Sequence, residues 1–360
     1  MATVKISHRE FLKIDRDYEK AASIAHLVYV SDKQPGISRL KKGKGFAYLY
    51  NGRFLHDKKE IRRIRSLAIP PAWTSVWICP VPNGHLQATG FDVRNRKQYR
   101  YHAAWSVLRN ETKFHKLIEF GKVLPLIRKQ IEDDLSVKEL TEKKVLATII
   151  TLMERTYMRV GNEEYEKQNG SYGLTTLKNR HVSVTGDKIL FSFKGKKGIF
   201  HNITLRNKKL ARIVQSCRDI PGKELFQYYD QEGGRKSVDS GMVNNYIREI
   251  TGMDFTAKDI RTWAGSLNLL KAFQSIGDTE DKNESKKNII AALDEVSLKL
   301  GNSRAICKKY YVHPGLIELY EKNNLQKFLR APENMNETEE SNGLKMEEKL
   351  LMKILQSFLE

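Results

Sequence analysis

Two adjacent tyrosines, Tyr310 and Tyr311, follow two lysines in the stretch CKKYYVHPG at residues 307–315. On a helix, such a pair can simply place one aromatic ring in the core and the other in solvent. Alternatively, one phenol could attack a phosphate held by cations, because nearby positive charge favours the phenolate over the weakly nucleophilic phenol. The two residues by themselves leave both interpretations open.

Other polar residues could take part in the same chemistry. Arg159 lies between two predicted helices, where its guanidinium could grip an anion, although a surface arginine is the commoner outcome. Lys196 lies at the tip of a glycine-flanked lysine hairpin and could act as a general acid, although such turns are usually only exposed. Arg261 falls in the first turns of a predicted helix, and Asn302 precedes Tyr311 by nine residues. Each of these residues alone is weak evidence for a catalytic site. Together, in the order Arg, Lys, Arg, Asn and Tyr along the chain, they are strong evidence for one.

Two periodicities in the chain predict the elements that position these residues. Alternation with a period of two predicts strands at 46–50, 75–80, 85–92 and 97–102, with a short helix expected at 57–67 and a strong hairpin signal at Asn51-Gly52. From Ala103 the period changes to 3.6, apart from three predicted strands within 181–205. In the second region we expect Gly161 to end one helix and Asn162 to cap the next.

The predicted fold class is therefore α+β. We expect a small β-rich N-terminal domain and a mainly α-helical catalytic domain that contains an inserted three-stranded sheet. The predicted segments are a helical extension at 1–35, a β-rich domain at 36–105 whose exposed cations suggest a binding role, the mainly α catalytic domain at 106–330, and an acidic tail ending in an amphipathic helix at 331–360.

The charge of the chain predicts an acidic partner. Lys plus Arg number 63 and Asp plus Glu number 43, which gives a net charge of +20. A polyanion repays clustered cations by releasing counterions, so nucleic acid is the leading candidate. An anionic membrane surface is the weaker alternative, because the sequence has no long apolar run and no signal-peptide pattern.

The same sequence predicts no cofactor. The three cysteines show no CxxC spacing, and we find no Walker loop, HExxH or EF-hand pattern. We therefore expect no metal, no nucleotide and no disulfide framework. A reducing, cytoplasmic and nucleoid-associated setting fits these expectations.

One predicted hairpin concentrates side chains that suit DNA. Amides and guanidiniums on paired strands can reach base edges, while tyrosines and lysines contact phosphates. An ordinary charged sheet face is the alternative interpretation. The DNA-binding candidates are Gln87, Arg94, Arg96, Lys97, Tyr99, Arg100 and Tyr101, together with Lys258 in the helical region.

Several stretches between about residues 38 and 320 resemble type IB DNA topoisomerases of the small, poxvirus-like bacterial branch. So many matching segments in one order are improbable by chance. They are IPPAW at 69–73, GHLQATG at 84–90, KQYRYH at 97–102, RVGNEEY at 159–165, NGSYGLTTL at 169–177, KDIRTW at 258–263 and CKKYYVHP at 307–314.

The resemblance implies a role for each of five residues. Tyr311, rather than Tyr310, would be the nucleophile that forms a 3′-phosphotyrosyl link. Arg159 and Arg261 would grip the non-bridging oxygens of the phosphate. Asn302 stands where the poxvirus enzymes have histidine, and its uncharged amide would donate to one of these oxygens.

The resemblance also implies the leaving-group chemistry and the mode of DNA binding. Lys196, which matches the family's FxGK pattern better than Lys194 or Lys197, would protonate the departing 5′-oxygen. Resealing would reverse the cleavage without ATP, and supercoils would relax between the two steps. A monomer would clamp double-stranded DNA.

Two other functions compete with this interpretation. A tyrosine site-specific recombinase would use the same set of arginine, lysine and tyrosine residues and form the same covalent link to DNA. Such enzymes usually have histidine three residues before the second arginine, where this chain has Lys258. A nucleoid-binding protein without activity is the other alternative, and the presence of all five polar residues argues against it.

Overall fold

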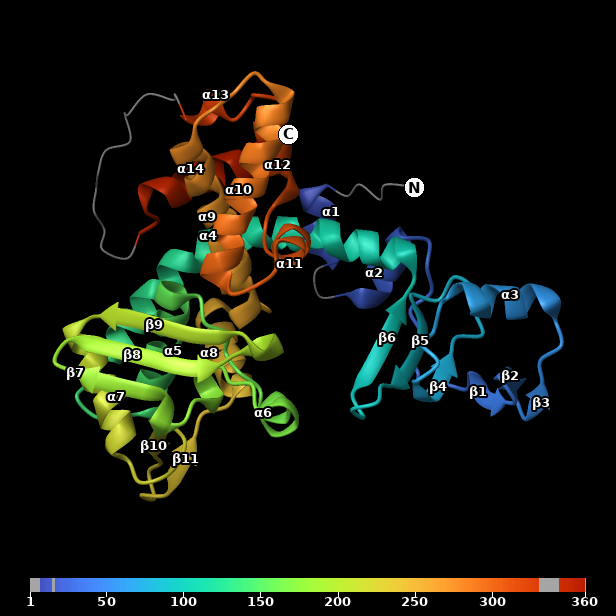
Figure 1. The fold of residues 1–360 in the computed structure, drawn as a ribbon, viewed down its shortest axis with the longest axis horizontal. Helices are drawn as coiled ribbons and strands as arrows, with labels where there is room; N and C mark the ends of the chain where they lie inside the picture. The colour runs from blue at the N-terminus through green and yellow to red at the C-terminus, as the bar shows by residue number, and fades with distance from the viewer. Residues whose placement is uncertain (1–6, 15–16, 330–342, 360) are drawn as a thin grey trace. The chain divides into compact units, whose positions relative to one another are not determined.

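The computed structural model describes residues 7–14, 17–329 and 343–359. The chain divides into two compact units, Met1–Lys116 and Leu117–Glu360. The acidic segment that the sequence predicts at 331–342 lies outside the described residues. Each unit has its own architecture, and together they confirm the predicted α+β class (Figure 1). None of the helices in the described part of the chain is long and apolar enough to cross a membrane.

The first unit is built on a six-stranded antiparallel sheet with the order β3-β2-β1-β4-β5-β6. The expected hairpin at Asn51-Gly52 is confirmed, since both residues have positive φ between β2 and β3. Strand β1 was not predicted, because its basic sequence reads as a loop. The strands are β1 (Ile37–Lys42), β2 (Gly45–Tyr50), β3 (Arg53–Phe54), β4 (Thr74–Ile78), β5 (Leu86–Phe91) and β6 (Lys97–Tyr101).

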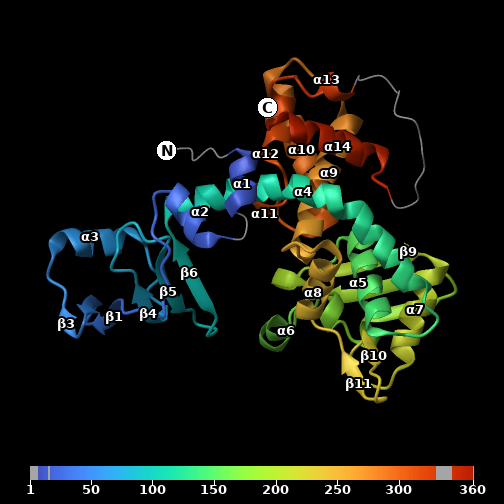
Figure 2. The same ribbon diagram turned by 180° about the vertical axis from the view of Figure 1, so that it is seen from behind.

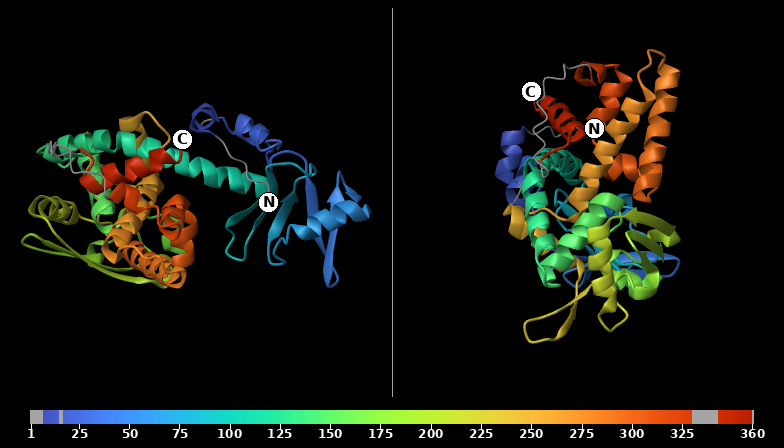
Figure 3. Two further views of the ribbon diagram at one scale, coloured as in Figure 1. Left: turned by 90° about the horizontal axis from the view of Figure 1, so that it is seen from above. Right: turned by 90° about the vertical axis from the view of Figure 1, so that its left-hand side faces the viewer.

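Helices cover parts of this unit and form two small cores. Ile64 of helix α3 packs with Ile37, Val76 and Ile78 of the sheet. A second core joins α1 and α2 to the start of α4, where Trp105 is buried. The helices are α1 (His8–Ile14), α2 (Tyr18–Ile24) and α3 (Lys58–Ser66), and α4 (Ala103–Ser136) continues as one long helix into the second unit (Figure 3).

The second unit is mainly helical. Helix α5 lies at its centre, since Val145, Ala147, Ile149 and Leu152 are each inaccessible to solvent. The helices that follow α4 are α5 (Glu142–Thr156), α6 (Glu163–Asn169), α7 (Lys208–Asp219), α8 (Ser240–Thr251), α9 (Ala257–Ile276), α10 (Lys282–Leu300), α11 (Arg304–Tyr310), α12 (Pro314–Glu321), α13 (Gln326–Leu329) and α14 (Met346–Ser357).

The predicted three-stranded insertion is present in the second unit. Ile189, Phe191 and Phe193 alternate inward along β8, and helix α7 packs on this buried face (Figures 1 and 2). The sheet has the order β7-β8-β9, and a separate hairpin pairs β10 with β11. The strands are β7 (Val182–Thr185), β8 (Lys188–Lys194), β9 (Phe200–Arg206), β10 (Gln227–Tyr229) and β11 (Arg235–Ser237), and the 3₁₀ turns are η1 (Leu174–Thr176), η2 (Asn179–His181) and η3 (Lys196–Gly198).

Candidate active site

The backbone around Arg159 is held on a neighbouring loop. The amide of Leu174 donates to the Arg159 carbonyl over 2.9 Å. Gly161 has a φ of +108°, and a Cβ on Gly173 would lie only 2.6 Å from the Gly161 Cα. The two glycines therefore let the two segments approach closely, and this contact fixes the backbone that carries Arg159.

Of the two helix boundaries predicted around this segment, the start of α6 is confirmed and the end of α5 is not. Helix α5 ends at Thr156, and Tyr157, with a left-handed φ of 57°, is its C-cap, so the prediction that Gly161 ends the helix is wrong. Asn162 is confirmed as the N-cap of α6, because its side chain accepts from the Tyr165 amide over 3.0 Å. The residues between the helices form an extended segment that presents Arg159.

Arg159 contacts the turn that carries Asn302. One guanidinium nitrogen, Nη2, donates to the Gly301 carbonyl over 3.1 Å and also to Asn302 Oδ1. The Asn302 backbone amide closes the end of α10 by donating to the Ser297 carbonyl over 2.9 Å. The side-chain nitrogen Nδ2 of Asn302 is buried, and among the described residues it interacts only with the weakly accepting Cys307 thiol. It is a donor oriented by Arg159 and available to an anion.

Arg261 is buried beside Arg159. Its side chain donates to the Tyr157 carbonyl and, over 2.8 Å, to the Leu300 carbonyl. Both carbonyls lie at helix C-termini, whose partial negative charge stabilises a cation. Burial lowers the pKa of Arg261, and the charge of Arg159 lowers it further, while Tyr311 partly offsets both effects. A buried guanidinium beside a half-buried one leaves excess positive charge for an anion to neutralise.

Tyr311 lies next to this pair of arginines. Its ring centroid is 5.2 Å from the Arg261 guanidinium carbon, and its charged form would raise the pKa of Arg159, which burial lowers. Tyr311 follows α11 as its C-cap, and its amide donates to the Cys307 carbonyl over 3.0 Å. Tyr310 is exposed instead, with the Lys309 ammonium 5.2 Å from its ring centroid.

Two residues of α9 that the sequence did not single out hold the Tyr311 segment. A Cβ on Gly265 would lie 2.3 Å from the Tyr311 carbonyl oxygen, so only glycine allows the helix to approach the chain this closely. The neighbouring Ser266 hydroxyl accepts from the His313 amide over 3.0 Å. Because Gly265 lies one turn after Arg261, one helix positions both Arg261 and Tyr311. A glycine inside a helical pattern was the available signal.

The C-terminal helix α14 supports the same region. Glu348, which is 2% exposed, binds Arg128 over 2.8 Å and accepts from the Trp263 indole over 3.2 Å. The Phe358 ring stacks on His313 with centroids 4.9 Å apart. Trp263 lies two residues after Arg261, and His313 lies two residues after Tyr311. Helix α14 is therefore part of the core of this unit.

Lys196 lies outside this cluster. It is exposed in the turn η3 between β8 and β9, and its ammonium nitrogen lies 5.4 Å from the Tyr165 ring centroid. The structure thus brings together Arg159, Arg261, Asn302 and Tyr311, whereas Lys196 stands on an exposed turn of the same unit. Lys258, in the first turn of α9, is also exposed.

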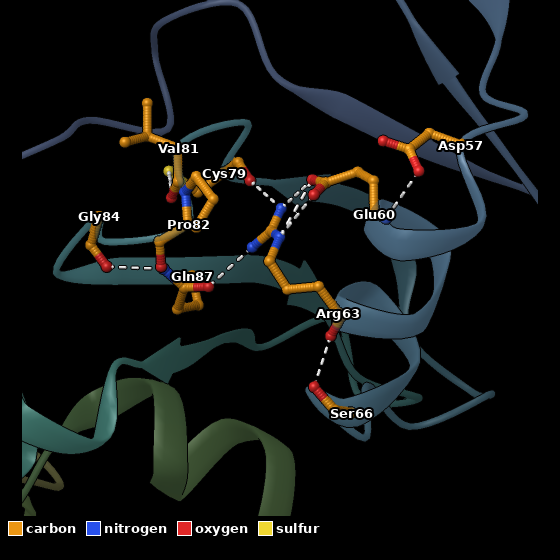
Figure 4. A network of polar contacts seen from close by, with 9 residues as sticks. All are labelled: Asp57, Glu60, Arg63, Ser66, Cys79, Val81, Pro82, Gly84 and Gln87. Atoms are coloured by element: carbon orange, nitrogen blue, oxygen red, sulfur yellow. Dashed lines mark hydrogen bonds and ion pairs between the residues drawn. The ribbon is translucent and has the colours of Figure 1, made fainter.

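In the first unit, Gln87 is not on the exposed face where the sequence suggested base contacts. It is 3% exposed, and both hydrogens of its amide nitrogen are used, on the Pro82 carbonyl at 3.0 Å and the Gly84 carbonyl at 2.7 Å (Figure 4). Its Oε1 accepts from Arg63 over 2.9 Å. Arg63 is in turn paired with Glu60, so Gln87 is one part of a closed network that fastens α3 to the sheet.

The other candidates of this unit lie on β6 or in the turn before it. Tyr99 and Tyr101 are each 47% exposed, and their rings stack with centroids 6.0 Å apart. Lys97 pairs with Asp32 over 2.6 Å. The three arginines differ: Arg94 is exposed, Arg96 pairs with Asp92 over 2.6 Å, and Arg100 donates to the Ala68 carbonyl over 2.9 Å.

A basic antiparallel sheet unit followed by a helical unit, in which two arginines and an amide surround a tyrosine, is an arrangement suited to cutting phosphodiesters. The comparisons with known proteins agree with it. Residues 99–338 match the family model "Eukaryotic DNA topoisomerase I, catalytic core", and residues 45–92 match "Bacterial DNA topoisomerase IB, N-terminal domain".

Individual relatives support the same assignment. DNA topoisomerase 1B of Acanthamoeba polyphaga mimivirus is 35% identical over 296 residues, which cover 80% of this chain and 88% of the viral protein. DNA topoisomerase 1B of vaccinia virus (strain Copenhagen) is 24% identical over 65% of this chain and 72% of its own. DNA topoisomerase 1 beta of Arabidopsis thaliana is 22% identical over 66% of this chain but only 24% of its own.

The chain therefore belongs to the type IB DNA topoisomerase family. It is an enzyme with type IB DNA topoisomerase activity, and its substrate is DNA. The resemblance found in the motifs of the sequence is confirmed.

Proposed function

We propose that this enzyme relaxes supercoiled double-stranded DNA by cutting one strand with Tyr311. The phenol oxygen attacks a backbone phosphorus, the bond from phosphorus to the 5′-oxygen breaks, and a 3′-phosphotyrosyl link forms. The observation that carries the proposal is the set of buried donors around Tyr311. Within the described part of the chain, the buried Asn302 Nδ2 interacts only with the Cys307 thiol and the buried Arg261 side chain reaches the Tyr311 hydroxyl, and both donors suit phosphate oxygens.

The arginines and Asn302 stabilise the charge that develops on the phosphate. Guanidiniums bind phosphate oxygens with fixed geometry, and Arg159 and Arg261 are held in place by carbonyls before any substrate arrives. Asn302 contributes orientation rather than charge, since its oxygen is held by Arg159 and its buried nitrogen can donate to the phosphate. Such prearranged donors lower the barrier because they need little reorganisation during the reaction.

Lys196 supplies the proton for the departing 5′-oxygen. An alkoxide leaves poorly, so a donor is needed at the point where that bond breaks. The exposed turn η3 allows the lysine to leave the Tyr165 ring and approach bound DNA. The link to Tyr311 conserves the bond energy of the phosphodiester. The 5′-hydroxyl can attack it in reverse and reseal the strand without a nucleotide.

DNA binding beyond the cleavage site involves the exposed residues of both units. We assign contacts to Tyr99, Tyr101, Arg94 and Lys258, which are exposed, and omit Gln87, whose amide is engaged inside the sheet. We further propose that the protein acts as a monomer that closes on duplex DNA of the nucleoid.

The first test is covalent trapping on a suicide DNA duplex, from which the cut strand cannot be resealed. We expect the wild-type protein to form a covalent adduct through the 3′ side of the nick. Tyr311→Phe should abolish the adduct, and the neighbouring Tyr310→Phe is the matched control that should retain it. An adduct that survives Tyr311→Phe would refute the assignment.

The second test separates a topoisomerase from a recombinase. Supercoiled plasmid is incubated with the protein alone, in EDTA and without nucleotide, across a range of salt concentrations. We expect relaxation that first accelerates with salt, as product release improves, and then declines as DNA binding weakens. Strand exchange that depends on two cognate sites would instead identify a recombinase.

A further inference from the structure

His201 on strand β9 occupies a place between two turns of the active-site unit. It pairs across the sheet with Phe193, and the two rings stack with centroids 5.1 Å apart. A Cβ on Gly195 would lie 2.6 Å from the His201 ring atoms Cδ2 and Nε2. A Cβ on Gly301 would lie 2.6 Å from ring atom Cε1. The imidazole is thus wedged between two glycines that are far apart in the sequence.

These glycines directly precede two residues of the proposed reaction. Gly195 is buried and is followed by the exposed Lys196. Gly301 is followed by Asn302, and its carbonyl accepts from Arg159. The ring therefore lies between the turn with the proposed proton donor and the turn with the oxyanion donors, and its edge contacts both.

The charges around His201 favour a neutral ring. Burial lowers its pKa, and the nearby guanidiniums of Arg159 and Arg261 lower it further. A neutral imidazole can sit beside two arginines without adding charge that they would repel. The residue thus lies close to both arginines, although no role in the reaction so far requires it.

We propose that His201 is a positioning residue that sets the distance between the Lys196 turn and the Asn302 turn, so that both address the same phosphate. The inference rests on the proposed role of Lys196 and deepens it. His201 itself contacts neither DNA nor the reacting atoms in this proposal. Its effect should appear mainly in protonation of the leaving group, because Asn302 is additionally held by Arg159 while the lysine turn is exposed.

The experiment compares two DNA duplexes in single-turnover cleavage. One has the ordinary phosphodiester, and the other has sulfur in place of the bridging 5′-oxygen. When the P–S bond breaks, the sulfur leaves as a thiolate that needs no proton near neutral pH, so the general acid becomes dispensable. Lys196→Ala is the reference variant, and we expect sulfur to restore most of its rate.

We expect His201→Ala to slow ordinary cleavage on the order of 10²-fold, the typical cost of a catalytic group misplaced by about 1 Å. On the sulfur-containing duplex, most of the lost cleavage rate should be recovered. His201→Phe, which retains a ring as a spacer, should lose less than His201→Ala. Equal slowing on both duplexes, or no slowing on either, would overturn the inference.

A reciprocal variant covers the case in which His201→Ala folds poorly. In Gly195→Ala the added methyl group would press on the His201 ring and displace the turn that carries Lys196. Cleavage of the ordinary duplex should therefore slow, and sulfur at the leaving position should recover most of the lost rate. In the His201→Ala background the added methyl group has room, so the double variant should lose less than the product of the two single losses. Multiplicative losses would contradict a contact between the two sites.

Failure of the proposed function can be recognised separately in the same experiment. If Lys196→Ala is not restored by sulfur, the lysine is not the proton donor and the inference about His201 falls with it. If Lys196→Ala is restored but His201→Ala is not, only the positioning role of His201 is refuted.

Discussion

Helix α9 approaches the Tyr311 backbone so closely at Gly265 that a single added methyl group should severely reduce the cleavage rate. In Gly265→Ala, the added Cβ would lie 2.3 Å from the carbonyl oxygen of Tyr311, and 2.9 Å from its carbonyl carbon and its Cβ. Ordinary contacts begin at 3.4 Å, so the backbone of the proposed nucleophile must move by about 1.1 Å or helix α9 must retreat. None of these three Tyr311 atoms is the flexible end of a side chain, so none can move aside easily.

This displacement should act on the reaction more than on folding. Misplacing a reacting group by 1 Å can cost about 10²-fold in rate. Overpacking of about 1–3 kcal/mol is partly offset by the gain of about 1 kcal/mol from replacing glycine with alanine in a helix. Because cleavage and resealing both use Tyr311 in one geometry, we expect both rates to fall while the equilibrium between them changes little.

The assay is single-turnover formation of the covalent adduct on a suicide duplex, with non-covalent DNA affinity and thermal unfolding measured in parallel. Gly241→Ala is the matched control, since it lies in helix α8 of the same unit and its Cβ would meet only the side chain of Asp239. We expect the control to cleave at the wild-type rate. If Gly265→Ala cleaves within threefold of wild type while remaining folded, close packing of α9 does not position Tyr311.

Three further predictions concern other parts of the second unit. Asn302→Ala should slow adduct formation about 10²–10³-fold in the same assay and leave non-covalent DNA binding nearly unchanged, because one oriented oxyanion donor is lost. Glu348→Ala should destabilise the fold by about 1.5–3 kcal/mol in denaturant titrations, because the buried Arg128 loses its charge-assisted hydrogen bonds to Glu348 and keeps only its pairing with Glu154 and the Gly343 carbonyl, whereas Glu347→Ala, at a half-exposed ion pair, should cost under about 1 kcal/mol. His201 has a lowered pKa in the folded state, so the unfolded chain binds its proton first and stability is lost as pH falls below about 6.5. His201→Phe should therefore flatten the fall of Tm between pH 7 and 5.5, and an unchanged slope would contradict the burial argument.

The family and its class of activity could be predicted from sequence because they depend on local patterns. The order of Arg159, Arg261, Asn302 and Tyr311 and the motifs around them identified the family before any fold was known. The hairpin at Asn51-Gly52 followed from turn chemistry, since both positions need a positive φ that these residues tolerate.

The errors arose where distant parts of the chain decide the outcome. Alternation along β5 predicts which face of the sheet Gln87 lies on, but not which residues cover that face. Arg63, which is 24 residues away in the sequence, donates to the Gln87 side chain and helps to bury it. Gly161 has a left-handed φ as expected of a helix end, but it serves a close approach to Gly173 instead. Neither partner can be read from the local sequence.

Residue types and their spacing were thus enough to determine the family and the chemical class of each candidate. Only the tertiary structure decided which atoms face the proposed reaction centre. The buried donors of Asn302 and Arg261, the close approach of Gly265 to Tyr311 and the wedge of His201 all depend on side chains from separate elements meeting in a packed core. Packing is set by three-dimensional distances of a few ångströms, and a linear pattern contains no measure of those distances.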